Sequence, residues 1–162
     1  MRLESERLTL SPISDAQMRA MIEEEPDAEL RQAYSEMLAG CLRNPAQRIW
    51  HAIWVIALKD RPGTVVGDLS FKGPPADGTV ELGYGLRSGC CGNGYMTEAV
   101  RAVCAWAFTQ PGVDRVEAET DPENRASRRV LAACGFTPTG VTGKEGPRFA
   151  IQKAGRGLPG SR

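Results

Sequence analysis

A strand, a glycine-containing loop, an amphipathic helix and a second strand follow one another between residues 79 and 120. The two outer runs, residues 79–86 and 113–120, are β-rich and bounded by turn residues. Between them, apolar residues recur at helical spacing: Met96, Val100, Val103 and Ala107. A helix that links two parallel strands crosses over right-handedly in nearly all proteins. This segment therefore predicts a right-handed βαβ unit and an α/β fold.

The N-terminal third predicts one strand followed by two helices. Residues 7–10 form a short apolar run that is typical of an edge strand. Ser14 or Asp15 can cap the first helix. The second helix runs from Leu30, where apolar residues begin to recur at helical spacing, to the Asn-Pro pair at residues 44–45.

The middle of the chain changes to a β pattern. Residues 50–58, 64–71 and 79–86 are β-rich and are separated by clusters of Gly, Pro and Asp, which predicts an antiparallel meander. After the βαβ unit, a last helix is expected over residues 125–134 and a short strand over residues 148–151.

Length and charge limit the classes of protein to consider. A chain of 162 residues is the size of one globular domain, so we expect a single domain over residues 1–154 and a flexible tail over residues 155–162, which are rich in Gly, Arg, Pro and Ser. Lys plus Arg and Asp plus Glu balance at 20 each. Because the chain has no net positive charge that would attract polyanions, we expect it to bind neither nucleic acid nor an anionic membrane.

The first ten residues carry several charges and lack the apolar core of a signal peptide, and no stretch resembles a membrane span. We therefore expect a cytoplasmic protein. The five cysteines lack the paired short spacings of a zinc site, so reduced thiols and no metal are expected.

The loop before the central helix contains Gly92, Asn93 and Gly94. A helix N-terminus presents unpaired N–H groups and a partial positive charge, and glycine lets the backbone approach an anion closely. The spacing matches neither a Walker loop nor a Rossmann loop. Taken alone, these residues fit an ordinary tight turn better than a phosphate site.

Two motifs together resemble a known family. The segment ELGYGLRSGCCGNGYMTEA, residues 81–99, is similar to the acetyl-CoA-binding motif of the GCN5-related N-acetyltransferases (GNAT), closest to the branch that acetylates the N-termini of ribosomal proteins. A second signature follows about 30 residues later, at Asn124, Ser127 and the pair at residues 135–136. The resemblance implies the GNAT fold, α/β (α+β), with a mixed, mostly antiparallel central sheet and helices on both faces.

The resemblance also implies how the chain binds acetyl-CoA. Backbone amides and one hydroxyl would hold the pyrophosphate, from Gly92, Asn93, Gly94, Tyr95, Met96 and Thr97. Main chain at Leu86 and Arg87 would pair with the pantetheine arm, and Asn124 would bond its amide. The family commonly has Gln or Arg where Cys91 stands, so this part of the loop would rely on its amides, and Arg87 is one candidate substitute.

The catalytic roles are also predicted from the resemblance. Many members use a carboxylate on the strand that feeds the loop, which is Glu81 here. Glu81 equally fits a solvated strand carboxylate, and Asp68 or Glu119 could then be the base. A backbone N–H near Leu86 would bind the oxyanion. Many relatives have a tyrosine in the last helix where Leu131 stands here. In the branch with the Asn-x-x-Ser signature the serine is the proton donor, and the resemblance places this role at Ser127.

The implied activity is transfer of an acetyl group from acetyl-CoA to a primary amine, by direct attack in a ternary complex. The alternative is a non-catalytic module that binds or senses acyl-CoA. The acidic stretch over residues 23–29 would roof the acceptor site, whereas His51 is expected to be structural. The resemblance also allows a homodimer joined through late strands, with residues 148–151 as an edge.

Overall fold

The computed structural model describes residues 1–154, and the tail expected over residues 155–162 lies outside this range. The elements are, in chain order, β1 (Leu3–Glu4), β2 (Leu8–Pro12), α1 (Asp15–Glu24), α2 (Ala28–Arg43), the 3₁₀ helix η1 (Pro45–Trp50), β3 (Trp54–Leu58), β4 (Val65–Phe71), β5 (Thr79–Leu86), α3 (Tyr95–Ala107), β6 (Arg115–Glu119), α4 (Arg125–Ala133), β7 (Thr137–Thr142) and β8 (Pro147–Gln152).

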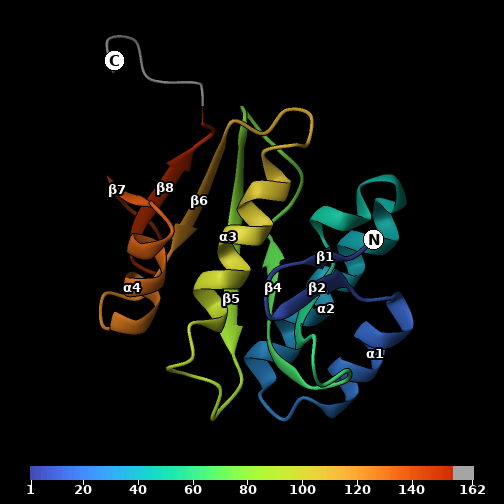
Figure 1. Ribbon diagram of the computed structural model, residues 1–162. Coiled ribbons are helices and arrows are strands. Elements are labelled where there is room, and N and C mark those ends of the chain that lie inside the picture. Colours follow the sequence, from blue (N-terminus) through green and yellow to red (C-terminus); the bar gives the residue numbers. More distant parts are fainter. Residues whose placement is uncertain (155–162) are drawn as a thin grey trace.

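Within residues 1–154, eight strands form one sheet in the order β1-β2-β3-β4-β5-β6-β8-β7 (Figure 1). Among these described strands only β5 and β6 run parallel, and α3 connects them, so the βαβ unit is confirmed. The other neighbours pair antiparallel. The sheet is therefore mixed and mostly antiparallel, as predicted.

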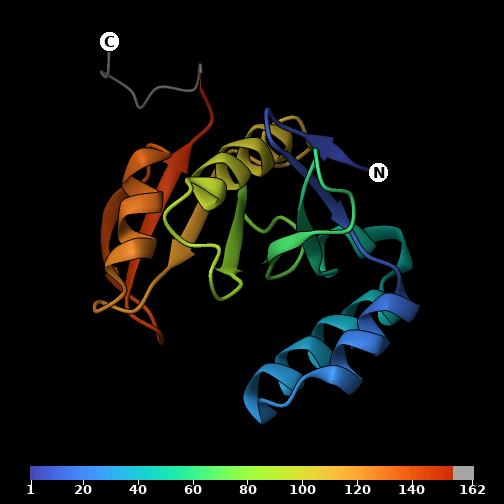
Figure 2. The same cartoon turned by 60° about the horizontal axis from the view of Figure 1, so that its bottom comes forward.

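Helices cover both faces of the sheet, which is also as predicted (Figure 2). On one face, α3 and α4 pack on a core that includes Val80, Leu82 and Leu131. On the other face, the α1–α2 hairpin packs on a smaller core that includes Met18 and Ile53. The site described below uses both faces.

The predicted first helix begins where its cap was expected. Ser14 accepts a hydrogen bond from the N–H of Gln17, and the Gln17 side chain accepts one from the N–H of Ser14, which is a capping box. Asp15 instead forms an ion pair with Arg48 on η1. These contacts fix the entry of the chain into the hairpin.

Three predicted strands need correction. β2 is not an edge, because β1 pairs on its outer side. β3 begins at Trp54 rather than at residue 50, because residue 50 is the last residue of the helix η1, which begins at Pro45. The edge expected at residues 148–151 is wrong, since β8 lies between β6 and β7. The true edge, β7, escapes the sequence pattern because Pro138 and Gly140 interrupt it.

Trp106 of α3 packs against Trp50, Trp54 and Phe71. The ring centroids of Trp50 and Trp106 lie 5.2 Å apart, and those of Trp54 and Trp106 lie 5.1 Å apart. Trp54 is fully buried and donates its indole N–H to the carbonyl of Ile49. The aromatic residues are thus part of the core.

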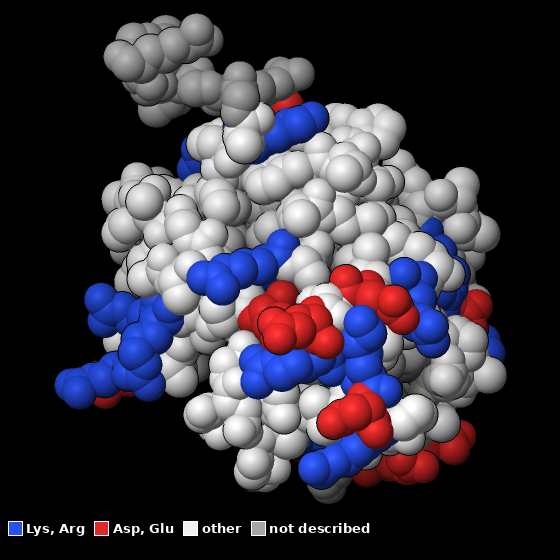
Figure 3. All heavy atoms as spheres, in the orientation of Figure 1, with Lys and Arg blue, Asp and Glu red and all other residues white. Residues whose placement is uncertain are grey.

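Charges of both signs are interspersed on the face shown in Figure 3.

Within residues 1–154, no helix combines the length and the apolar character that crossing a membrane requires.

Candidate functional site

The parallel pair β5–β6 is joined at one end only. Residues 79–81 of β5 pair with β6, whereas residues 82–86 pair only with β4 on their other side. β6 continues along β8 instead. The two strands therefore diverge, as Figure 1 shows, and leave one backbone edge of β5 open to a ligand.

Backbone alternation decides which amides face this opening. The N–H of Arg87 donates to the carbonyl of Val66 at 2.8 Å, so it points toward β4. Because successive peptide groups of a strand point to opposite edges, the N–H of Leu86 points toward the opening. Of the two residues predicted to contact the pantetheine arm, only Leu86 presents its N–H there.

The glycine loop leads from the open edge of β5 to the N-terminus of α3. Gly92 and Gly94 have φ values of 83° and 75°, a left-handed conformation that favours glycine. Gly94 is the N-cap of α3 and forms no side-chain capping bond. The first N–H groups of the helix therefore remain free of helical acceptors. Met96 buries its side chain in the core, so only its backbone can contact a ligand.

Arg7 and Glu98 brace this loop from the N-terminal strands. The Arg7 guanidinium donates to the carbonyl of Asn93 at 2.8 Å and to Glu98 at 2.7 Å, and it lies 4.7 Å from the ring centre of Tyr95. Burial raises the pKa of Glu98, but hydrogen bonds from Ser5 and Arg7 outweigh it and hold this pKa below its usual value. Arg7 was not predicted, because it lies 86 residues before Asn93 in the sequence.

Ser127 lies on the first turn of α4 and meets a second hydroxyl. Its Oγ is 2.9 Å from the Oη of Tyr84 on β5, and either oxygen can donate. Burial raises the pKa of Tyr84, so its hydroxyl stays protonated at neutral pH. Asn124 is the N-cap of α4 and accepts the N–H of Ser127 at 3.0 Å. The predicted donor is therefore held in place from two sides.

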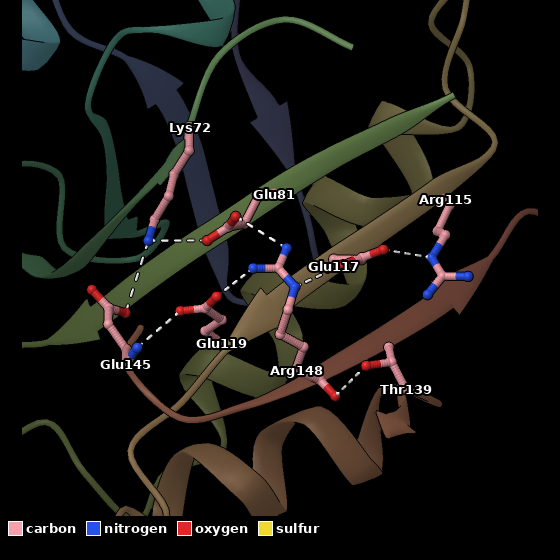
Figure 4. A network of polar contacts seen from close by, with 8 residues as sticks. All are labelled: Lys72, Glu81, Arg115, Glu117, Glu119, Thr139, Glu145 and Arg148. Atoms are coloured by element: carbon pink, nitrogen blue, oxygen red, sulfur yellow. Dashed lines mark hydrogen bonds and ion pairs between the residues drawn. The ribbon is translucent and has the colours of Figure 1, made fainter. Parts of the chain in front are cut away.

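Glu81 lies in an ion-pair network at the closed end of β5–β6 (Figure 4). Its carboxylate is 3.0 Å from Lys72 Nζ and 3.1 Å from Arg148 Nη2. Arg148 also bonds Glu117 and Glu119. Two cations therefore hold the predicted base, on the face of the sheet opposite to the Tyr84 and Ser127 hydroxyls.

A cavity of about 980 Å³ lies under the α1–α2 hairpin, on the same face as Glu81. Its floor is made by Gly83 and Gly85 of β5, and Asp68 of β4 stands beside them. Of the acidic stretch over residues 23–29, Glu24 and Glu25 belong to the cavity wall. The cavity thus reaches the open strand from the side opposite to Ser127.

Asp68 is the most buried carboxylate of the cavity. The hydroxyl of Tyr34 donates to its Oδ2 at 3.4 Å. Burial raises the pKa of Asp68, although the Tyr34 bond and the charge of Arg87 oppose the change. Burial and the charge of Asp68 raise the pKa of Tyr34 to about 12. Sequence analysis named Asp68 only as a substitute base, and it missed Tyr34.

His51 and the loop cysteines occupy different places. His51, expected to be structural, lies on the cavity wall, and its Nε2 is buried without a hydrogen-bond partner in the described part of the chain. Cys91 is exposed on the loop and Cys90 is half-buried, both as free thiols. Among residues 1–154, no three His, Cys, Asp or Glu side chains gather as a metal-binding group.

Known proteins share this architecture. An acetyltransferase (GNAT) domain model matches residues 6–137. An N-acetyltransferase of Bacillus subtilis (strain 168), the uncharacterized YjdG, is 31% identical over 84 residues, which is 51% of this chain and 49% of that protein. The chain thus spans about half the length of this curated relative.

Two solved structures show the same fold. The ribosomal-protein-S5-alanine acetyltransferase from Vibrio fischeri aligns with a TM-score of 0.74 and 17% identity, covering 98% of this chain and all of the other. The ribosomal L7/L12 α-N-protein acetyltransferase RimL, in complex with coenzyme A, aligns with a TM-score of 0.73 and 16% identity, covering 94% and 98%. The family match extends over most of the sequence, and the sheet, the opening and the glycine loop agree with it, so the chain belongs to the acetyltransferase (GNAT) domain family.

Proposed function

We propose that this chain transfers the acetyl group of acetyl-CoA to a primary amine, by direct attack in a ternary complex. The observation that carries the proposal is the continuity of the open edge of β5 with the capless N-terminus of α3. An extended amide-containing arm fits the strand edge, and a pyrophosphate fits the helix end. The coenzyme A complex of the RimL relative, which has the same fold, supports this assignment.

The pyrophosphate would be bound mainly by backbone. Amides from Gly92 to Thr97 surround the start of α3, and Arg7 fixes the loop through Asn93. Cys91 brings no cation to this loop, so the amides and the helix end provide the attraction. A site built from backbone tolerates the loss of the Gln or Arg side chain that relatives carry there.

The chemistry needs an oxyanion donor and an acid beside the thioester. The N–H of Leu86 points into the opening and can donate to the carbonyl oxygen as negative charge develops there. As the C–N bond forms and the C–S bond breaks, the sulfur takes a proton from Ser127. Tyr84, at 2.9 Å, can return a proton to Ser127. The proton released by the amine goes to a carboxylate on the cavity side.

The alternative is a domain that binds acyl-CoA without catalysis. Leu131 stands where many relatives have a tyrosine, which favours that alternative. The hydroxyl pair of Tyr84 on β5 and Ser127 on α4 supports catalysis instead, because either hydroxyl can act as a proton donor. The two functions differ in turnover and share the binding step.

Isothermal titration with acetyl-CoA, beside NAD and ATP, tests the binding half of the proposal. Release of free thiol in the presence of a panel of primary amines tests the transfer. We expect binding of acetyl-CoA alone and amine-dependent thiol release. Binding with no thiol release would favour the non-catalytic module, and no binding would exclude both.

A further inference from the structure

Asp68 stands directly beside the backbone that is expected to hold the thioester. In the β4–β5 ladder the Cα partner of Asp68 is Gly85, the residue before Leu86. A Cβ built on Gly85 would meet nothing within 4 Å, so no side chain separates the carboxylate from this part of the strand. Asp68 therefore faces the reacting end of β5 across bare backbone.

Glu81 lies farther from this point and is already engaged in two ion pairs. It precedes Gly85 by four residues, which corresponds to roughly 13 Å along a strand. Lys72 and Arg148 both contact its carboxylate. Both ion pairs hold this carboxylate at the closed end of β5–β6, away from the opening.

From these positions we propose that Asp68 receives the acceptor amine and takes its proton, with Tyr34 positioning the carboxylate, and that Glu81 anchors the sheet. This inference rests on the proposed acetyltransferase function. An amine arrives as an ammonium ion, forms an ion pair with Asp68 and transfers one proton to it. Asp68 passes this proton to solvent in the cavity and is ionised again. The neutral nitrogen then attacks the acetyl carbon from the cavity side and loses its second proton to Asp68. The C–S bond breaks as Ser127 protonates the sulfur from the opposite side, and Ser127 recovers a proton from Tyr84, which takes one from solvent.

The surroundings of Asp68 suit this role. Tyr34 and Glu25 from the hairpin and Arg87 from the end of β5 are the groups that act on its charge. The wider cavity wall adds Glu24, Glu36 and Glu145 against Lys72, with His51 also on the wall. Carboxylates outnumber cations, which favours a positively charged acceptor. Burial raises the pKa of Asp68 toward the working pH, where a general base is most effective.

The test compares Asp68→Asn with Glu81→Gln, using the best amine from a panel that contains a diaminoalkane, an amino-acid amide and a short peptide. We expect Asp68→Asn to lower kcat/KM by about 100-fold or more and to abolish the fall of kcat/KM at acidic pH. Glu81→Gln should lower kcat/KM by less than about 10-fold, and its kcat/KM should still decrease at acidic pH. Asp60→Asn, an exposed turn carboxylate, is the matched control and should leave activity unchanged.

Two further measurements follow the pKa of Asp68, and the first of them does not depend on turnover. Carbon-13 NMR of labelled carboxyl groups should show a raised pKa for Asp68, which a bound diaminoalkane lowers because the cation favours the carboxylate. Tyr34→Phe removes a bond that favours the ionised form, so the acidic limb of the pH profile should move to higher pH while kcat above it is retained.

The outcomes separate this inference from the proposed function. If Asp68→Asn retains activity while Glu81→Gln loses it, the assignment of the base is overturned and the transfer function stands. If the wild-type protein binds no acetyl-CoA or releases no thiol, the proposed function itself fails. Titration of acetyl-CoA into each variant, together with its melting temperature, shows that a loss of activity is not a loss of folding.

Asp68 should also reduce stability. Its pKa is higher in the folded than in the unfolded state, so the ionised carboxylate is disfavoured by folding. This cost is absent below the unfolded-state pKa and complete above the folded-state pKa. Asp68→Asn should therefore raise the melting temperature at pH 7 by a few degrees and leave it nearly unchanged near pH 3. A lower melting temperature at pH 7 would contradict the raised pKa.

Discussion

The hydroxyl oxygens of Tyr84 and Ser127 lie 2.9 Å apart, and they join the open part of β5 to the first turn of α4. Each residue comes from a different wall of the opening. A hydroxyl pair in this position can pass a proton toward a leaving sulfur without a tyrosine at position 131.

Removal of the hydroxyl pair should slow the transfer step. Ser127→Ala is expected to lower kcat by about 100-fold, because the sulfur loses its direct donor. Tyr84→Phe should have a smaller effect, about 10-fold, and the double variant should resemble Ser127→Ala, since both groups act in one chain. Stopped assays of thiol release measure these rates.

Ser35→Ala is the matched control for this prediction. The Ser35 hydroxyl donates to the carbonyl of Arg31 within α2 and lies outside the opening. The rate of thiol release by Ser35→Ala should therefore equal that of the wild-type protein. Undiminished turnover in Ser127→Ala would remove Ser127 from the proton path. A weaker affinity for acetyl-CoA in that variant would instead point to a binding role.

The Arg7–Glu98 brace should matter for both stability and cofactor affinity. Glu98→Gln is expected to lower the melting temperature at pH 7 by about 2–4 °C, because the bonds from Ser5 and Arg7 lose their anionic acceptor. The folded-state pKa of Glu98 is lowered, so its contribution is complete above the unfolded-state pKa and is lost as the pH falls through the folded-state value. The difference from the wild-type protein should therefore shrink between about pH 5 and pH 3.

A second variant, Arg7→Ala, removes the hydrogen bond that Arg7 donates to the carbonyl of Asn93. We expect weaker binding of acetyl-CoA by about 10-fold, measured by titration. Arg2→Ala serves as the control, because Arg2 forms only an exposed pair with Glu4 that contributes little. Equal affinities for the two variants would show that the loop keeps its shape without Arg7.

The glycine at the N-cap of α3 should be sensitive to any side chain. Gly94 has φ 75°, and a Cβ there would also approach Arg7 Nη2 at 3.4 Å. Gly94→Ala should weaken acetyl-CoA binding by about 10-fold or more, because the amides must rotate away from the anion. Gly140→Ala has a similar φ, 83°, on β7 and controls for backbone strain alone. If both variants lose affinity equally, the loss comes from backbone strain in general, and the loop at Gly94 does not contact acetyl-CoA.

The aromatic core should carry a large part of the stability. Trp54→Ala removes a fully buried ring and leaves the carbonyl of Ile49 without its indole donor. We expect a loss of about 3–5 kcal/mol in the free energy of unfolding, measured with urea. Leu42→Ala, on the exposed side of α2, should change it by less than about 0.5 kcal/mol. A small effect at Trp54 would mean that the core relaxes around the gap.

Local patterns predicted much of this fold. The alternation of β5, the apolar stripe of α3 and the cap of α1 are properties of neighbouring residues, and they appear where the sequence places them. The strands β1 and β7 were missed, because a two-residue strand and one broken by Pro138 and Gly140 carry no such pattern.

The sequence by itself determined the glycine loop and the motifs that mark the cofactor half. The tertiary structure decided which side chains meet there. Asp68 lies beside Gly85 only through the register of β4 and β5, and Arg7 reaches Asn93 across 86 residues of chain. Such contacts depend on how strands pair and how helices cross, which distant parts of the chain settle together when they bury their apolar faces.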